Sequence, residues 1–427
     1  MHTPMTRDLS IISSKCATDS SVRFRLLVVM LIGAQTTGTV ATATLPSIAP
    51  HVAQTLGVPS KLIGYQISLI AAAMLISLAF GGNLGRRFGA CRVTQIALVS
   101  EAIGALLCIA GTLPAIALGS VFMGLGYGTM TPAASQLLMR FTPHDKRNLI
   151  FSIKQTGVPL GGIVAAAMQP AIAVHIGWIH TLMLVAMIAV ALALAMQVKR
   201  ARWDDDRDRR VPFATKAHDG IGAIWRHPAL RNLSLSGAAL VIVQISLTTF
   251  TVALFVEDLG YSLIAAGFVL TVSQVGGVAG RIFWGWFADR LGNCMLALGL
   301  LCVLMGGSAA ACAALSGSTP LAIVYLVFFM LGATASGWNG AYLAEIARVS
   351  PPGSVGAATG ASLFVVNVGK FAGPLLFAYA LTWAESYRLM FAALALPSAL
   401  ALLFVVRAAY RTERTVARDS PPERHAT

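Results

Sequence analysis

Five ionisable residues lie inside long apolar runs of this 427-residue chain, and they are the residues best placed to do chemistry. They are Glu101, Lys154, Arg281, Glu345 and Lys370. A charged side chain in the middle of a bilayer costs about 3 kcal/mol or more unless it is paired or hydrated, so such residues usually bind a solute, an ion or a proton. The sequence therefore predicts a polar site enclosed by apolar helices.

The three cations favour an anionic solute, because positive charge in a low dielectric attracts anions. Lys370 is the strongest candidate, since it lies too deep in its run for its side chain to reach the membrane surface easily. Arg281 lies two turns before Asp289, so it either lines a cavity or anchors the following loop. Lys154 lies about two turns into its run, where it either binds solute or extends to the membrane surface.

The two acids are candidates for proton coupling. Loss of hydration favours the protonated form of a carboxyl, and proton coupling requires that form to be accessible. Glu101 is alternatively a helix-pairing residue. Glu345, one turn before Arg348, is alternatively a gating charge that pairs with the opposite half of the molecule.

Uncharged polar side chains in the same runs complete the predicted binding site. Serine and threonine hydroxyls are weaker candidates, because they readily bond to the backbone of their own helix. An amide in an apolar setting cannot easily satisfy all of its donors and acceptors alone. The predicted substrate-binding set is therefore Lys370, Arg281, Lys154, Asn339, Gln244, Asn367, Tyr127 and Gln35.

The composition indicates which elements must position these residues. The chain is 56% hydrophobic and only 11% charged, against roughly 25% charged in soluble domains. A helix needs about 20 mostly apolar residues to span a bilayer. The sequence predicts an all-α membrane protein with twelve transmembrane helices near 26–50, 61–82, 93–111, 114–140, 148–174, 178–198, 231–257, 263–288, 294–315, 320–345, 355–382 and 387–407.

The order of these runs predicts two similar halves. Gly64 and its surroundings match Gly267 at a shift of 203 residues, and a parallel duplication of six helices explains the match. The predicted organisation is an N-terminal tail (1–25), a first six-helix bundle (26–198), a linker (199–230), a second six-helix bundle (231–407) and a C-terminal tail (408–427).

The distribution of charge predicts the topology. Of the 31 Lys and Arg residues, only Lys61 and Arg388 fall in loops on one side, whereas most of the others fall on the opposite side. Positive charge marks the cytoplasmic side, so both termini are expected there, in a multi-pass protein of a bacterial inner membrane. The same distribution explains the net charge of +14 by contact with the lipid bilayer, and excludes a nucleic-acid partner.

A loop signature follows the predicted eighth span. Residues 285–292 read Gly-Trp-Phe-Ala-Asp-Arg-Leu-Gly, with Gly285, Asp289, Arg290 and Gly292 at the characteristic positions. This segment resembles the G-x-L-A-D-R-x-G loop of the major facilitator superfamily. Glycines permit a tight reversal of the chain, and the charged residues pair between helices.

A second copy of the signature follows the predicted second span. It keeps Gly82, Arg87 and Gly89, but it has Arg86 where the family usually has Asp. The resemblance implies two six-helix bundles that rock about a central site, with the fifth, eighth and eleventh helices around the cavity. It also implies gating roles for Asp289, Arg290, Gly285, Gly292, Arg87, Gly82, Gly89, Glu345 and Arg348, and a monomeric protein.

The leading functional hypothesis is a secondary transporter of a small organic anion, such as a carboxylate, coupled to protons. The alternative is a proton-coupled exporter of hydrophobic or cationic compounds. Such exporters commonly carry an acid in the first or fourth helix, which is missing here. The eight histidines are dispersed and no phosphate-binding loop is found, so no enzyme activity, metal or cofactor is expected.

Overall fold

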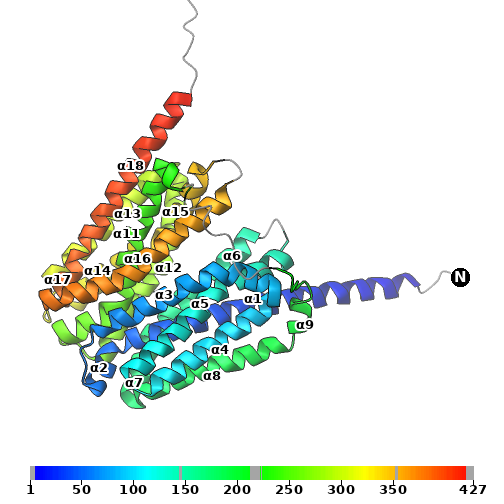
Figure 1. Cartoon of the computed structure of the whole chain (residues 1–427), viewed down its shortest axis with the longest axis horizontal. Coiled ribbons are helices and arrows are strands. Elements are labelled where there is room, and N and C mark those ends of the chain that lie inside the picture. The colour runs from blue at the N-terminus through cyan, green and yellow to red at the C-terminus, as the bar shows by residue number, and fades with distance from the viewer. Residues whose placement is uncertain (1–4, 144–146, 212–221, 223, 352–353, 420–427) are drawn as a thin grey trace, which may run out of the picture.

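The fold consists of helices throughout. A computed structural model of the chain describes residues 5–143, 147–211, 222, 224–351 and 354–419 (Figure 1). It is 88% helical, with no strand in these residues. Eleven helices in the described ranges are long and apolar enough to span a membrane, and the shorter apolar segment Leu62–Ser77 accompanies them. This count agrees with the predicted twelve-helix membrane fold.

The first half holds the helices that precede the linker. They are α1 (Met5–Ser47), α2 (Ala49–Leu56), α3 (Leu62–Phe88), α4 (Ala90–Ile109), α5 (Leu113–Phe141), α6 (Arg147–Gln155), α7 (Gly157–His175), α8 (Trp178–Gln197) and α9 (Arg200–Trp203). α1 begins well before the predicted start of the first span, so the described part of the N-terminal tail continues the same helix.

The second half repeats this arrangement. Its elements are α11 (Pro228–Ala253), η2 (Leu254–Asp258), α12 (Leu263–Leu291), α13 (Cys294–Ala311), η3 (Cys312–Ala314), α14 (Leu321–Gly337), α15 (Asn339–Val349), α16 (Val355–Ala384), α17 (Tyr387–Ala393) and α18 (Ala395–Asp419). α18 likewise continues past the predicted end of the last span.

Several predicted spans are divided rather than continuous, and two of the divisions lie beside the central cavity. The fifth is interrupted at Thr156, between α6 and α7, and the tenth at Trp338, between α14 and α15. Both interrupting residues keep right-handed helical dihedral angles, so each span changes its hydrogen bonding without reversing direction. Gln155 and Asn339, which flank the two interruptions, both line the central cavity described below.

The two halves touch mainly through two helix pairs, with smaller contacts of α11 to α1, α2 and α3. α3 packs against α16, and α7 packs against α12. In Figure 1 the halves meet near α2 and α17 and diverge toward the side from which the start of α1 and the end of α18 project. The Ser60 and Tyr387 hydroxyls, one from each half, are 2.7 Å apart at the closed side.

The duplicated glycines Gly64 and Gly267 each form a close contact with the backbone of the opposite half. A Cβ atom added to Gly64 on α3 would lie 2.6 Å from the carbonyl oxygen of Pro374 on α16. A Cβ atom added to Gly267 on α12 would lie 2.6 Å from the carbonyl oxygen of Ala166 on α7. Because real Cβ atoms do not approach oxygen so closely, only glycine permits these contacts. Equivalent glycines of the two halves thus make equivalent contacts at the closed side.

The linker is fastened to the first half by Asp204. Its buried carboxylate accepts hydrogen bonds from the backbone N–H groups of Cys91 (2.7 Å) and Arg92 (2.9 Å). These donors are at the beginning of α4, where the helix dipole also favours negative charge. Gly89, with φ of 97°, leaves room for the carboxylate. A linker carboxylate therefore caps the start of α4. The preceding loop has Arg86 at the position where the family usually has Asp.

Further contacts extend this fastening along the linker. Arg140 at the end of α5 pairs with Asp205 and with Asp206. Arg87 donates a hydrogen bond to the carbonyl oxygen of Val211 at 2.8 Å. These pairs are partly exposed, so each contributes little alone. Together they hold residues 204–211 against the first half.

Substitution of Gly64 by Val is expected to weaken the closed contact. Overpacking of this kind costs about 1–3 kcal/mol, so the share of molecules open at this side should rise about fivefold or more. Labelling of a single cysteine placed at Ser60, in a background without native cysteines, measures the change. Gly360→Val is the control, because Gly360 faces open space. Equal labelling of the two variants would contradict this role of Gly64.

Asp204→Ala is expected to destabilise the protein by about 0.5–2 kcal/mol, because a helix cap is lost. Burial raises the pKa of Asp204 from 3.8 to about 6. The folded protein therefore binds this proton more tightly than the unfolded chain does. Protonation of Asp204 therefore stabilises the folded state. This contribution is fully present below pH 3.8, the pKa in the unfolded chain, and is lost as pH rises through about 6.

The difference in melting temperature between the wild type and Asp204→Ala should therefore widen as pH falls from about 7 to about 5. Asp205→Ala is the matched control, since Asp205 is 58% exposed. A difference that narrows with falling pH, or an equal effect of both substitutions, would contradict the assignment.

Candidate functional site

A cavity of about 350 Å³ lies between the two halves, on the open side of the closed contacts. Its size is within the range of small-molecule sites. Polar side chains of both halves line it: Gln35, Thr39, Thr42, Tyr127, Thr131 and Gln155 from the first, and Gln244, Thr248, Thr249, Gln274, Arg281, Ser336, Trp338, Asn339, Asn367 and Lys370 from the second.

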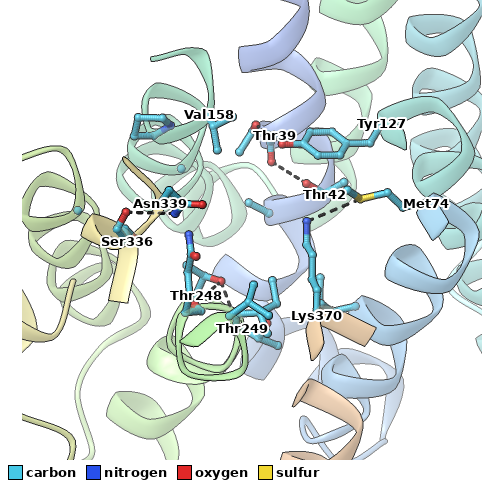
Figure 2. A pocket seen from close by; sticks show the side chains of 18 of the residues that line it. Thr39, Thr42, Met74, Tyr127, Val158, Thr248, Thr249, Ser336, Asn339 and Lys370 are labelled. Atoms are coloured by element: carbon cyan, nitrogen blue, oxygen red, sulfur yellow. Dashed lines mark hydrogen bonds between the residues drawn. The ribbon is translucent and has the colours of Figure 1, made fainter. Parts of the chain in front are cut away.

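Lys370 extends from α16 across the boundary between the halves. Its ammonium nitrogen lies 3.7 Å from the sulfur of Met74 and 5.5 Å from the centre of the Tyr127 ring. Figure 2 shows the side chain pointing toward Met74 and Thr42, with Asn339 and Ser336 on the opposite side of the cavity. A thioether and an aromatic face are weak partners for an ammonium group, so this cation retains donors for a ligand.

Arg281 contributes a second cation from α12. Its Nε donates to the carbonyl oxygen of Ser336 at 3.2 Å, and Asn339 donates to the same oxygen at 3.4 Å. The guanidinium group lines the cavity and is bonded to α14, so its orientation is set by the second half rather than by the Asp289 loop. Arg281 and Lys370 are the two charged side chains among the described residues that line the cavity.

The predicted amides reach the cavity from several helices. The Gln244 side-chain oxygen accepts a hydrogen bond from the Trp338 indole at 3.2 Å, which leaves its N–H₂ group as a donor. The Asn367 amide donates to the carbonyl oxygen of Leu363 at 2.8 Å. On the first half, the Tyr127 hydroxyl lies 3.3 Å from the Thr39 hydroxyl.

Lys154, a predicted substrate-binding residue, lies behind the cavity wall in this structure. Lys154 is 2% exposed and does not line the cavity. Its ammonium group donates to the side-chain oxygens of Gln35 (2.7 Å) and Gln155 (3.2 Å), and both of these glutamines do line it. A buried ammonium requires acceptors, so Lys154 holds the two amides in place from behind the cavity surface.

The expected pairing of Glu345 across the halves is also not formed. Glu345 is 1% exposed and pairs with Arg348, one turn later on α15, at 2.5 Å. This pair joins neighbours on one helix face, and the halves are apart at this end of the molecule. Glu101, the other candidate for proton coupling, is 0% exposed and lies behind the cavity wall.

The residues of the two loop signatures lie away from the cavity. Asp289 and Arg290 are exposed near the end of α12, and the Arg290 guanidinium lies 5.9 Å from the centre of the Trp286 ring. Gly292 ends α12 in the left-handed helical conformation (φ 64°), and Gly89 ends α3 with a positive φ of 97°. Gly285 faces open space, and Gly82 lies within α3. Arg87 contacts the linker, as described above.

Sequence reasoning missed part of the wall. The polar residues Gln155 and Ser336 line the cavity. Apolar residues also line it, including Ile67, Ile70 and Met74 on α3 and Val241 and Ile245 on α11. Their spacing of three or four residues places each group on one helix face, which is a detectable signal. In an all-apolar helix, however, the face toward lipid shows the same residue types.

Comparison with known families identifies the fold and its role. The model of the Major Facilitator Superfamily matches residues 30–374. The chain belongs to this superfamily. It is therefore a multi-pass membrane transporter and not an enzyme.

Individual relatives have low sequence identity, but they match over most of the chain. The chain is 27% identical over 415 residues to the 4-hydroxybenzoate transporter PcaK of Pseudomonas putida, covering 86% of this chain and 88% of the relative. It is 23% identical over 344 residues to a benzoate transport protein of Acinetobacter baylyi, covering 74% and 73%. Among solved structures, a peptide transporter of the POT type matches with a TM-score of 0.74 and 17% identity, covering 91% of this chain and 95% of that one.

Proposed function

We propose that this transporter carries small aromatic carboxylates across the membrane by alternating access, coupled to protons. The observation that carries the proposal is the charge of the cavity. Two cations line it, and the described lining residues include no acid to neutralise them. An anionic ligand compensates this charge where a neutral or cationic one does not.

The cavity also suits the rest of such a molecule. A carboxylate can accept charge-assisted hydrogen bonds from an ammonium and a guanidinium group. The apolar faces formed by Ile67, Ile70, Val241 and Ile245 suit an aromatic ring. The relatives named for 4-hydroxybenzoate and benzoate transport support the same class of compound, since both compounds combine a ring with one carboxylate.

The arrangement of the halves supports alternating access. The described structure is closed at Ser60–Tyr387 and at the two glycine contacts, and its halves diverge at the side of the chain ends. If the termini are cytoplasmic, as the charge distribution predicts, this is the inward-open state. The opposite state requires separation of the halves at Gly64 and Gly267 and closure at the other end.

Three probes that share a benzene ring test the charge preference. Benzoate is anionic, benzamide neutral and benzylamine cationic. At 100 times its dissociation constant a ligand stabilises the folded protein by about 2.7 kcal/mol, which a melting scan detects. Benzoate alone is expected to raise the melting temperature of the purified protein. Stabilisation by benzylamine but not by benzoate would instead support the alternative function, an exporter of cationic compounds.

Lys370→Gln and Arg281→Gln are each expected to weaken benzoate binding by about tenfold to a hundredfold. A hydrogen bond to a charged group contributes about 1.5–3 kcal/mol, and 1.4 kcal/mol corresponds to a factor of ten. Titration of the purified variants with benzoate measures the change. Lys61→Gln is the matched control, because Lys61 precedes α3 and does not line the cavity. Unchanged affinity in both cavity variants would contradict the proposed site.

A further inference from the structure

Glu101 is a carboxyl group enclosed between helices of the first half. It lies on α4, is 0% exposed, and neither of its oxygens has a hydrogen-bond partner among the described residues. A carboxylate in this place would lose its hydration without compensation, so the neutral acid is the favoured form. An unpartnered buried acid is costly to keep and has no evident role in packing.

Two glycines make the space that the carboxyl occupies. A Cβ atom added to Gly38 on α1 would lie 2.6 Å from the Glu101 Oε1 atom. A Cβ atom added to Gly126 on α5 would lie 3.0 Å from its Cγ atom. Any larger residue at these positions would displace the side chain. The carboxyl therefore lies in a slot where α1 and α5 pack against α4.

Tyr127 separates this slot from the cavity. A Cβ atom at Gly38 would also lie 3.1 Å from the Tyr127 ring, so the ring and the Glu101 carboxyl meet at the same point. Tyr127 lines the cavity, and the Lys370 ammonium lies over its ring at 5.5 Å. Glu101 is thus behind the Tyr127 side chain, which lines the proposed anion site.

The charge environment of Glu101 is otherwise sparse. Helices α1, α3, α5, α8 and α9 pack against α4. Among the described residues, Tyr127 is the titratable group that these helices bring to the slot. Other ionisable residues of these helices stand at or near helix ends: Arg86, Arg87, Arg140, His180 and Arg200, with Asp204 after α9. Helix α4 itself also carries Arg92 and the thiols of Cys91 and Cys108.

We infer that Glu101 is the site at which the transporter carries its proton, with Tyr127 as the side chain that separates it from the solute. This rests on the proposed function. On one side of the membrane, an O–H bond of a hydronium ion breaks as an O–H bond forms on a Glu101 oxygen, which leaves water and the neutral acid. On the other side, the Glu101 O–H bond breaks as water takes the proton and becomes hydronium, which leaves the carboxylate.

Electrostatics links this proton to the solute. With an empty cavity, the positive potential of Lys370 and Arg281 disfavours a proton on Glu101. A bound anion cancels that potential and adds negative charge, so it favours protonation of Glu101. By reciprocity, the protonated acid favours binding of the anion. Anion and proton therefore bind together and leave together, which is symport.

Transport of radiolabelled benzoate into proteoliposomes tests the inference. Uptake into protein-free liposomes, which measures passive entry of the neutral acid, is subtracted. The wild type should accumulate benzoate when the outside is more acidic than the inside. Glu101→Gln should lose this accumulation but retain counterflow in preloaded vesicles, because exchange requires no net proton movement. Accumulation by Glu101→Gln at the wild-type level would overturn the inference.

Glu385→Gln is the matched control, because Glu385 is an exposed carboxyl outside the cavity. It should accumulate benzoate like the wild type, and loss of accumulation in both variants would contradict a specific role for Glu101. If the wild type shows no counterflow above the blank, the proposed function fails, and the coupled cycle fails with it.

Infrared spectroscopy examines the acid independently of any solute. The wild type at neutral pH should show a carboxylic-acid C=O band that shifts in D₂O and is missing from Glu101→Gln. Glu101→Asp should keep an acid band at a changed frequency, which separates loss of the acid from loss of folding. Absence of a Glu101-dependent band would overturn the proton site even if benzoate is transported.

Discussion

The cost of unpaired charge in an apolar interior governs this structure. Lys370 and Arg281 lie at a cavity between the halves without a neutralising acid among the described residues around it. Such charges are tolerated where water or an anion can reach them, which requires a cavity that opens. The separation of the halves and the polar lining both follow from this requirement.

The remaining buried ionisable groups meet the same constraint in different ways. Lys154 is satisfied by two glutamine oxygens, and Glu345 by Arg348. Asp204 is satisfied by two backbone donors at the start of α4. Glu101 differs because its oxygens have no partner within the described chain. This difference, rather than burial alone, distinguishes it as a group available to exchange a proton.

Much of the fold was predictable from the sequence, because spans of apolar residues and the matched glycines are local signals. The cavity positions of Lys370, Arg281, Gln244 and Asn339 were also predictable, because polar groups at membrane depth need one another or water. The role of Lys154 was not, since its partner Gln35 is 119 residues away and only packing brings them together. The pairing of Asp204 with α4 was hidden in the same way.

A structure with bound 4-bromobenzoate tests the central claim most directly, because anomalous scattering locates the bromine and therefore the direction of the ring. We expect the carboxylate to lie at Lys370 and Arg281, with the bromine toward the apolar residues of α3 and α11. A ligand bound outside this cavity, or one whose carboxylate points away from both cations, would contradict it.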